Sequence, residues 1–504
     1  MKRCTGLASA ALATLLAAGP AAAQKSADTL RAVNYTQIAD VTPYYNQIRD
    51  GLLIAHHAWD GLVYRDPESF AIKPLLATSW KYIDDTTLEF TLRKGVKFHD
   101  GSPFSADDVV YTLNSIPTDK MVSTPSNFSW LAGAEKVDDF TVRVKLKRIF
   151  PAAMEYLAMV VPIMPKVYRE RVGVEAYSKA PIATGPYRLT RVVVPSEFDF
   201  ERFDDYVPDS PKPKPPIKRL ILSEVTDANT ALVQLIGGKA DWTWNFIPDA
   251  FDNVAKMPGL TAMRGGSMRV NDIGFDVAGR TGANNPLTNE KVRQAIAYAI
   301  NREDISKNLM PGSRVLNTPC YPTQFGCDET AAVRYPYDPA KAKALLAEAG
   351  YPNGFDTELV TYLPAQFPAV VQNNLRAVGI NAKVSVLQVQ AVIQRGIEGT
   401  VPLGYTNWGS YSVNDASAFL PSFINGGPQD TIRDPELQKL VDMAGSSINP
   451  DERRRYYSAA IKIITEKMYF LPMYNSVVTY GLTKDLNFKP YPDELPRFYL
   501  SSWK

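Results

Sequence analysis

The segment that most constrains the fold is Leu88–Ile116, LEFTLRKGVKFHDGSPFSADDVVYTLNSI. Apolar and polar side chains alternate at its start, which predicts a half-buried strand over Thr87–Leu92. The glycine-containing turn Lys97–Ser102 follows. Ser105 is a favourable helix N-cap, and Asp108 can complete a shortened capping box. A strand, a turn and a capped helix in succession predict an α/β fold.

The N-terminal residues 1–23 have the organisation of a secretory signal peptide. Lys2 and Arg3 precede the apolar stretch Leu7–Ala18, and Ala21–Ala23 supplies a small-residue cleavage site. The apolar stretch is shorter than the ~20 residues that a membrane span needs. Cys4 lies inside the signal, far from the cleavage site, so no lipoprotein anchor is predicted. We expect a soluble, exported mature protein with a periplasmic location.

Length and charge restrict the classes of protein and partner. A chain of 504 residues is too long for one ordinary core and predicts two or three domains. The formal net charge is +2, and Lys2 and Arg3 account for it. The remaining chain is neutral and has no basic stripe, which argues against nucleic acid or an anionic membrane surface as a partner.

Two cysteines remain after the signal, Cys320 and Cys327. Export implies an oxidising compartment, so a local disulfide is expected. The alternative is a metal or redox pair, but the spacing is not C-x-x-C and no nearby histidine completes a site. Because the closed loop is short, its stabilisation is expected at the low end of the usual range.

Strand and helix signals alternate along the rest of the chain, which indicates α/β domains rich in parallel strands. The proline-rich stretch Val207–Pro216 is expected to be an extended surface loop. The expected helices include Asn229–Ile236, Thr288–Ile300, Asp338–Gly350, Phe367–Val378, Asp434–Ala444 and Asn449–Tyr469, and the expected strands include Ala240–Trp244, Phe355–Tyr362, Ala382–Leu387 and Pro402–Asn407.

Five segments in order resemble one family. Besides Leu88–Ile116, they are WDGLVYRDP at Trp59–Pro67, ATGPYRL at Ala183–Leu189, NPLTNEKVRQAIAYAINREDI at Asn285–Ile305 and KAKALLAEAGYPNGF at Lys341–Phe355. Together they resemble the family-5 solute-binding proteins of bacterial ABC importers, the peptide, nickel and opine type. The resemblance implies capture of a small solute outside the cytoplasm and its delivery to a membrane permease.

The resemblance also implies a fold of the type II periplasmic binding proteins, class C: two α/β lobes joined by a hinge, plus an extra inserted domain. Residues 24–65, 185–270 and 476–504 would form lobe I, residues 66–184 the inserted domain, and residues 271–475 lobe II. The solute would be enclosed when the lobes close about the hinge. No cofactor is implied, and we expect a monomer.

A cleft for a small polar solute needs aromatic walls and a few fixed polar groups. Two segments at the ends of predicted strands offer both, where open α/β sheets place ligands. The first supplies Trp242, Trp244 and Asn245, and the second supplies Trp408, Tyr411, Asn414 and Asp415. Ordinary core or surface packing is the alternative for Trp242 and Trp244. Tyr45 is a further candidate, with a surface turn as its alternative.

The resemblance places the aspartate that binds a peptide's α-amino group at the third residue after Trp408, where this chain has Tyr411. Asp415, four residues further along, is a candidate substitute. The stretch Val360–Phe367 also contains no arginine for a dipeptide carboxylate. A dipeptide held by both charged ends is therefore not favoured, and a larger peptide, an opine or a sugar-like solute remains open.

Metal binding and catalysis are minor alternatives. His56 and His57 could serve a nickel complex, as in some proteins of the resembled family, and a nickel complex therefore stays among the alternative solutes. Adjacent histidines point in different directions on a helix, however, so no metal site is predicted there. His99 is expected to order its turn. The chain lacks G-x-S-x-G and H-E-x-x-H motifs, although a carboxylate pair for glycoside hydrolysis has no sequence signature. We predict a binding protein for a peptide-like solute and not an enzyme.

Overall fold

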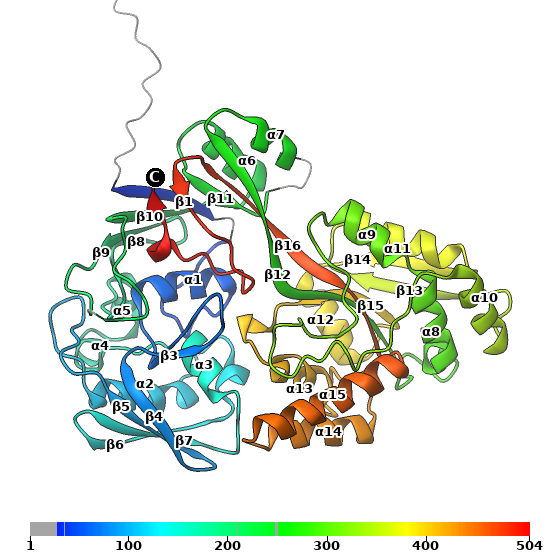
Figure 1. Cartoon of the computed structure of the whole chain (residues 1–504), viewed down its shortest axis with the longest axis horizontal. Coiled ribbons are helices and arrows are strands. Elements are labelled where there is room, and N and C mark those ends of the chain that lie inside the picture. Colours follow the sequence, from blue (N-terminus) through cyan, green and yellow to red (C-terminus); the bar gives the residue numbers. More distant parts are fainter. Residues whose placement is uncertain (1–27, 35, 208, 247–249) are drawn as a thin grey trace, which may run out of the picture.

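Two lobes share one ten-stranded sheet in the computed structural model (Figure 1). The structure describes residues 28–504 except residues 35, 208 and 247–249, and it does not describe the side chain of Tyr411. The predicted signal peptide lies outside these residues. Within the described ranges, no helix has the length and apolar character needed to cross a membrane.

The lobes are connected by two long antiparallel strands, β12 (Leu260–Phe275) and β16 (Phe470–Thr483). The strand order of the whole sheet is β14-β13-β15-β12-β16-β11-β1-β10-β9-β8. The chain passes from lobe I to lobe II along β12 and returns along β16, so both crossings belong to the sheet itself (Figure 1).

Lobe I contains the N-terminal and C-terminal parts of the described chain. Its central strand β1 is parallel to both β10 and β11. Its strands are β1 (Thr29–Asn34), β8 (Tyr187–Val193), β9 (Glu197–Arg202), β10 (Arg219–Glu224), β11 (Trp242–Trp244), β17 (Leu486–Asn487) and β18 (Ser502–Trp503), and its helices are α1 (Arg49–Ala58), α6 (Ala228–Ile236), α7 (Phe251–Lys256) and the 3-10 turn η7 (Phe498–Leu500).

A separate four-stranded antiparallel sheet, β4-β5-β7-β6, packs on lobe I and shares its core. The capping box is present: Ser105 N donates to Asp108 Oδ2 at 2.9 Å, and α2 begins at the next residue. This region comprises β2 (Val63–Arg65), β3 (Ile72–Pro74), β4 (Ala77–Asp84), β5 (Thr87–Leu92), β6 (Leu131–Asp138), β7 (Thr141–Leu146), α2 (Ala106–Ser115), η1 (Ile116–Thr118), η2 (Pro125–Phe128), α3 (Ala153–Met159), α4 (Lys166–Val172) and α5 (Val174–Lys179).

Lobe II is an α/β unit in which β13 lies parallel to β14 and to β15. Apolar cores lie on both faces of its sheet. Its elements are β13 (Phe355–Thr361), β14 (Ile380–Val386), β15 (Leu403–Trp408), η4 (Pro286–Thr288), α8 (Glu290–Ala299), α9 (Arg302–Leu309), α10 (Pro339–Glu348), α11 (Gln366–Arg376), α12 (Val389–Glu398), η5 (Ser410–Ser412), η6 (Ala416–Ala418), α13 (Leu420–Phe423), α14 (Pro435–Gly445) and α15 (Pro450–Glu466).

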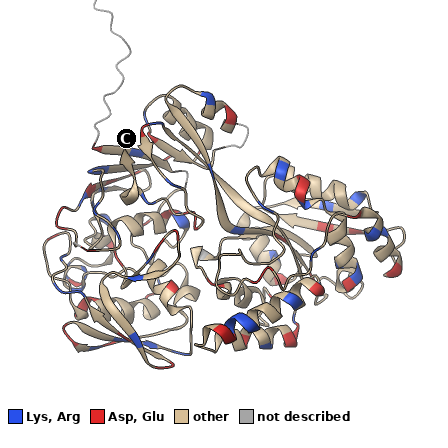
Figure 2. Cartoon of the chain, viewed as in Figure 1, with Lys and Arg blue, Asp and Glu red and all other residues tan. Residues whose placement is uncertain are grey.

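Charged residues of both signs are interspersed over the two lobes (Figure 2). Helices such as α14 and α15 carry both acidic and basic residues. This mixture is the spatial counterpart of the nearly balanced composition of the chain.

Candidate functional site

The lobes meet through the segment 409–415, which follows β15 and which we call the seam segment. Ser410 and Ser412 have φ values of 52° and 61°, in the left-handed region that non-glycine residues seldom occupy. Val413 is fully buried and packs in the core of lobe I, although it belongs to lobe II. The seam segment is therefore a strained extension of lobe II that docks on lobe I.

Polar groups of lobe I and of the region packed on it receive the seam segment. Arg65 donates to the backbone oxygen of Ser412, and its Nη1 also lies 2.9 Å from Glu155 Oε2. The same Glu155 oxygen accepts the Asn414 N–H at 3.0 Å. Ser412 Oγ donates to the backbone oxygen of Asp493 at 2.7 Å. The cluster of Arg65, Glu155 and Asp493 thus binds the backbone of the seam segment at Ser412 and Asn414, and also the Ser412 hydroxyl.

The carboxylate of Asp493 organises this cluster. Arg65 Nη2 lies 2.7 Å from Asp493 Oδ2, and Arg497 donates to both carboxylate oxygens. Burial alone raises the pKa of the Asp493 carboxyl, but the charge and hydrogen bonds of Arg497 and the charge of Arg65 outweigh it and hold the pKa well below its usual range. Asp493 is therefore ionised and fully paired.

A second ionic cluster lies where β12 leaves lobe I. Glu494 pairs with Arg49 and, at 3.0 Å, with Arg269 Nη2. Burial raises the pKa of Glu494, but the charges of Arg269 and Arg49 outweigh it and lower the pKa to about 2. Arg269 Nη1 also donates to Asn407 Oδ1 at 3.2 Å. A Cβ at Gly409 would lie 2.6 Å from Arg269 Nη2, so a larger residue there would displace the Arg269 guanidinium.

Trp408, the last residue of β15, immediately precedes the seam segment, and Asn414 lies near the end of that segment. Trp408 is half-buried, donates from Nε1 to the Ala418 oxygen at 3.1 Å and packs edge-on against Phe423. Asn414 contributes to a hollow of about 420 Å³ beside the loop 322–328 and Arg454. The side chain of the third predicted residue, Tyr411, lies outside the described residues. Their roles in solute binding stay a prediction.

Asp415 has a structural environment that the sequence did not indicate. Its carboxylate is 3% exposed, and both oxygens lie 2.9 Å from Arg453 Nη2. Oδ1 also caps η6 by accepting the Ser417 N–H at 2.9 Å. Because both oxygens already bind a guanidinium within lobe II, the carboxylate is not free to replace the missing amine-binding aspartate.

Trp242 and Trp244 occupy the core of lobe I, which corrects the expectation that they face a cleft. Their exposed fractions are 0% and 1%. The ring of Trp242 packs against Tyr480, Phe488 and Phe498, and Trp244 Nε1 donates to Asn34 Oδ1 at 2.8 Å. Ordinary aromatic packing, the alternative weighed from sequence, describes both rings.

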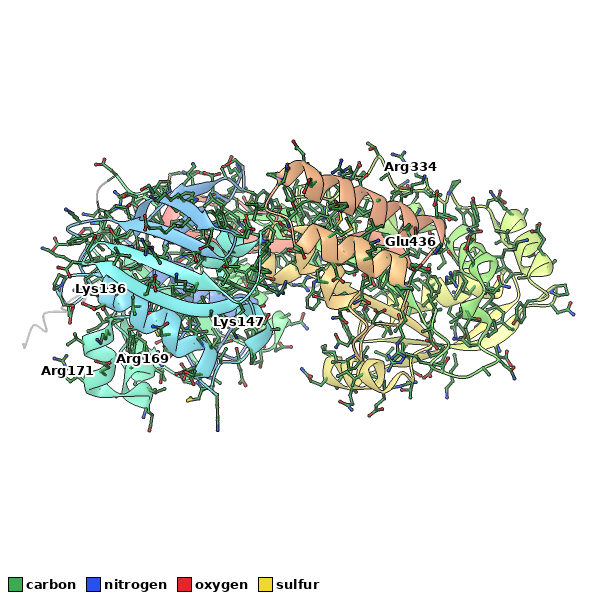
Figure 3. All side chains as sticks on the ribbon, turned by 90° about the horizontal axis from the view of Figure 1, so that it is seen from below. Lys136, Lys147, Arg169, Arg171, Arg334 and Glu436 are labelled. Atoms are coloured by element: carbon green, nitrogen blue, oxygen red, sulfur yellow. A yellow bond between two sulfur atoms is a disulfide. The ribbon has the colours of Figure 1, made fainter. Side chains whose placement is uncertain are left out.

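Asn245 and Tyr45 are also placed away from the seam contacts. Asn245 follows β11 with φ 54°, and its backbone N–H donates to the Thr479 oxygen at 2.8 Å. Tyr45 donates to Asp119 Oδ2 at 2.6 Å and accepts from Arg169 Nη2 at 2.5 Å, and burial raises its pKa to about 12. Figure 3 shows Arg169 in the lobe I half of the molecule, so the Tyr45 hydroxyl orders contacts within that half.

The predicted disulfide between Cys320 and Cys327 is present and braces the seam segment. Within its loop, Gln324 Nε2 donates to the Val413 oxygen at 2.8 Å. Phe325 N–H donates to the Asn414 oxygen at 3.1 Å, and the Phe325 oxygen accepts the Ala416 N–H at 2.9 Å. The loop therefore acts as a short additional strand beside the seam.

The histidines are neutral and serve packing. His57 Nε2 accepts the Phe498 N–H at 2.9 Å, which leaves Nδ1 to donate to the Leu53 oxygen at 2.7 Å. Burial lowers the pKa of His57 to about 3 and lowers that of His56 well below its usual value. Among the described residues, no three His, Cys, Asp or Glu side chains are grouped to hold a metal ion.

Two α/β lobes joined by a two-strand crossing, with a strained segment of one lobe docked on the other, define a bilobal binding protein. The model of the bacterial extracellular solute-binding proteins, family 5 (middle region), matches residues 71–430, and the chain belongs to this family. It is therefore a solute-binding protein with a role in transport and not an enzyme. Its fold is the two-lobed type II-like α/β fold of these proteins.

Relatives and solved structures cover nearly the whole chain. The glutathione-binding protein GsiB of Salmonella choleraesuis (strain SC-B67) is 29% identical over 491 residues, which span 93% of this chain and 92% of the relative. HbpA2 from Haemophilus parasuis superposes with a TM-score of 0.81 and 25% identity, over 94% of this chain and all of the other (100%). A dipeptide-binding protein from Pseudoalteromonas sp. SM9913 in complex with Met-Leu gives 0.77 at 22% identity, over 94% and 100% of the chains, and shows the common fold.

Proposed function

We propose that this protein captures a peptide or peptide-like solute between its lobes in the periplasm and delivers it, as a monomer, to the permease of an ABC importer. The observation that carries the proposal is the docking of the seam segment of lobe II on lobe I beside the β12–β16 crossing. Relatives named for glutathione binding and a similar fold solved with Met-Leu support a peptide-like solute.

The mechanism is reversible enclosure without covalent chemistry. Trp408 would provide a stacking surface, and Asn414 and the side chain of Tyr411 would contribute from the same segment. Because the seam segment joins these residues to the lobe I cluster around Arg65 and Asp493, solute contact and lobe closure would act on one piece of chain. The closed form would then be the one that the permease recognises.

The test is binding of purified protein to a solute panel, measured by thermal unfolding and then by calorimetry. The panel contains glutathione, Met-Leu, longer peptides, opines, oligosaccharides and nickel–histidine complexes. A solute present at 100 times its dissociation constant adds about 2.7 kcal/mol to the free energy of unfolding. Stabilisation by glutathione or peptides supports the proposal, and stabilisation by sugars or nickel complexes alone would overturn the peptide-like class.

The importer role is tested in cells. Deleting the gene should abolish uptake of the solute that stabilises the purified protein, and a copy encoding the full chain should restore it. Uptake that persists without the protein would show that delivery to a permease is not its function. A copy without residues 1–23 is the matched control for export, since it should bind the solute in vitro and fail to restore uptake.

A further inference from the structure

Asp272 is a buried carboxylate that has no cationic partner among the described residues. It lies on β12 and is 5% exposed, and the one hydrogen bond that the described residues give its carboxylate is long, 3.5 Å from Thr406 Oγ1. In the described part of the chain, no lysine, arginine or histidine forms an ion pair with it. The buried carboxylates in and around the seam segment have cationic partners. Asp493, Glu494 and Asp415 each pair with at least one arginine.

Asp272 lies near the carboxyl ends of the parallel strands of lobe II. The β12–β15 register places it opposite Thr406, and Trp408 lies two residues further along the same face of β15. The parallel strands β13 and β15 both end here, at Thr361 and Trp408. Ligands of such sheets bind at the carboxyl ends of the strands. In Figure 1, β12 and β15 lie side by side where the chain enters lobe II.

The neighbours of Asp272 do not neutralise it. Thr406 on β15 offers a hydroxyl, Pro472 on β16 offers no N–H, and the phenols of Tyr362 and Tyr405 are near enough for Asp272 to raise their pKa values. The nearest guanidinium on β12, that of Arg269, is engaged by Glu494 and Asn407. Burial raises the pKa of the Asp272 carboxyl to about 7, so a cation from outside would ionise it fully.

We infer that Asp272 receives a primary ammonium group of the solute and so restricts the solute to amine-bearing peptides and peptide-like molecules. This inference rests on the proposed function and deepens it. The position after Trp408 that would carry an amine-binding aspartate holds Tyr411, and the carboxylate of Asp415 is committed to Arg453. Asp272 supplies the missing charge from the neighbouring strand, on the same face as Trp408.

The experiment compares free and blocked amines. Calorimetry on the full purified protein uses glutathione, Met-Leu and a tripeptide, each beside its N-acetylated form. The wild type should bind a free amine about 10-fold to 100-fold more tightly than the acetylated form, as expected for a buried hydrogen bond to a charged group. Asp272→Asn should lose this preference, and Asp108→Asn, at a buried carboxylate of α2, should keep it.

Proton release provides a readout that does not depend on the variant folding. When a wild-type carboxyl that is partly protonated near neutral pH binds an ammonium, it releases a proton, and the observed binding enthalpy then changes with the ionisation enthalpy of the buffer. We expect this change for the free amines. Equal affinity for free and acetylated solutes, or amine binding without proton release, overturns the role of Asp272 and leaves the proposed function standing. Failure of every probe overturns the proposed function and this inference with it.

Discussion

Two aspartates of lobe II, Asp415 and Asp272, have similar burial and opposite surroundings. Asp415 is closed off by Arg453, whereas Asp272 has one weak hydroxyl contact. Pairing stabilises a buried charge, and the lack of pairing leaves a group that a ligand can satisfy. The partners of each carboxylate, more than its place in the sequence, separate a structural role from a binding role.

Replacing Asp415 by Asn should reduce stability rather than affinity. Arg453 would keep its charge in a buried site and lose its carboxylate, which costs about 3 kcal/mol of unfolding free energy. Urea unfolding of the variant and the wild type measures the difference. A normal unfolding midpoint combined with lost solute binding would contradict the structural assignment and return Asp415 to the binding site.

Replacing Trp408 by Ala should abolish solute binding while the protein stays folded, because the half-buried ring is expected to stack on the solute. We expect at least about a tenfold loss of affinity, or about 1.4 kcal/mol. Trp408→Phe is the matched control and should keep most of the affinity. Circular dichroism checks the fold, and unchanged affinity in the alanine variant would remove Trp408 from the site.

At the scale of elements, short loops hold the chain where strands and helices end. The disulfide loop 320–327 adds backbone and side-chain hydrogen bonds to the seam segment. The turn Lys97–Ser102 holds the segment before β8 in a similar way. His99 Nε2 donates to the Gly185 oxygen at 3.0 Å, and His99 Nδ1 accepts the Ala183 N–H at 3.3 Å. In both places, a short loop forms hydrogen bonds that hold a segment distant in sequence.

Removing the disulfide by Cys320→Ser with Cys327→Ser should loosen the seam segment. Closing a loop of this length is worth about 2.5 kcal/mol in the chain-entropy model. Calorimetry should show that loss, and hydrogen exchange should show faster exchange at residues 413–416. Protection unchanged from the wild type would mean that the loop does not brace the seam. Reducing the wild type with a dithiol should reproduce the variant.

The contribution of His99 to stability should disappear in acid. Burial lowers its pKa from 6.5 to about 4, so the folded protein keeps it neutral while the unfolded chain takes up a proton below pH 6.5. Its stabilisation is thus present above pH 6.5 and is lost as the pH falls toward 4. The deficit of His99→Asn relative to wild type should shrink by about 2 kcal/mol between pH 6.5 and about pH 5. A deficit independent of pH would contradict the neutral assignment.

At the scale of the whole molecule, the structure is a closed arrangement held partly by Val413. This residue of lobe II is fully buried in the core of lobe I, and the Arg65–Asp493 cluster binds the backbone oxygen of the preceding residue, Ser412. The apolar contact and the ionic cluster therefore act on the same equilibrium between separated and joined lobes.

Replacing Val413 by Ser should shift the protein toward separated lobes. Losing the burial of a valine side chain costs about 2 kcal/mol, which changes the ratio of closed to open forms about 30-fold. Small-angle scattering should show a larger radius of gyration without solute and recovery at saturating solute. Val392→Ser, in a buried position of α12, is the control and should leave the radius unchanged. An unchanged radius in the Val413 variant would mean that the seam does not govern closure.

Local patterns predicted the elements better than the site. The alternation at Thr87–Leu92, the cap at Ser105 and the spacing of Cys320 and Cys327 each act within a few residues, and the structure contains all three features. The long strand β12 was less apparent because Gly265 and Gly266 interrupt its pattern, and pairing with β16 supports it instead.

The site depends on contacts that no local pattern encodes. Arg65 and Asp493 are 428 residues apart in sequence. The sequence could not distinguish Trp242, packed in a core, from Trp408 at the end of a strand, since both are tryptophans near predicted strand ends. The sequence does not single out Asp272, because one acidic residue within a strand has no signature until its neighbours in the fold are known.

The crossing between the lobes is a ribbon of two paired strands, and its ladder is irregular between Gly266 and Val270 and again between Asn271 and Asp272. A ribbon twists most easily where its ladder is interrupted, so these residues form the fulcrum of any rotation. Displacement grows with distance from a fulcrum. A molecule seated beside Asp272 would therefore move little itself, while the outer rims of both lobes would swing through the longest arcs. A small rotation at the crossing would thus produce a large displacement at the outer rims of the lobes, and a membrane partner could detect that difference in shape.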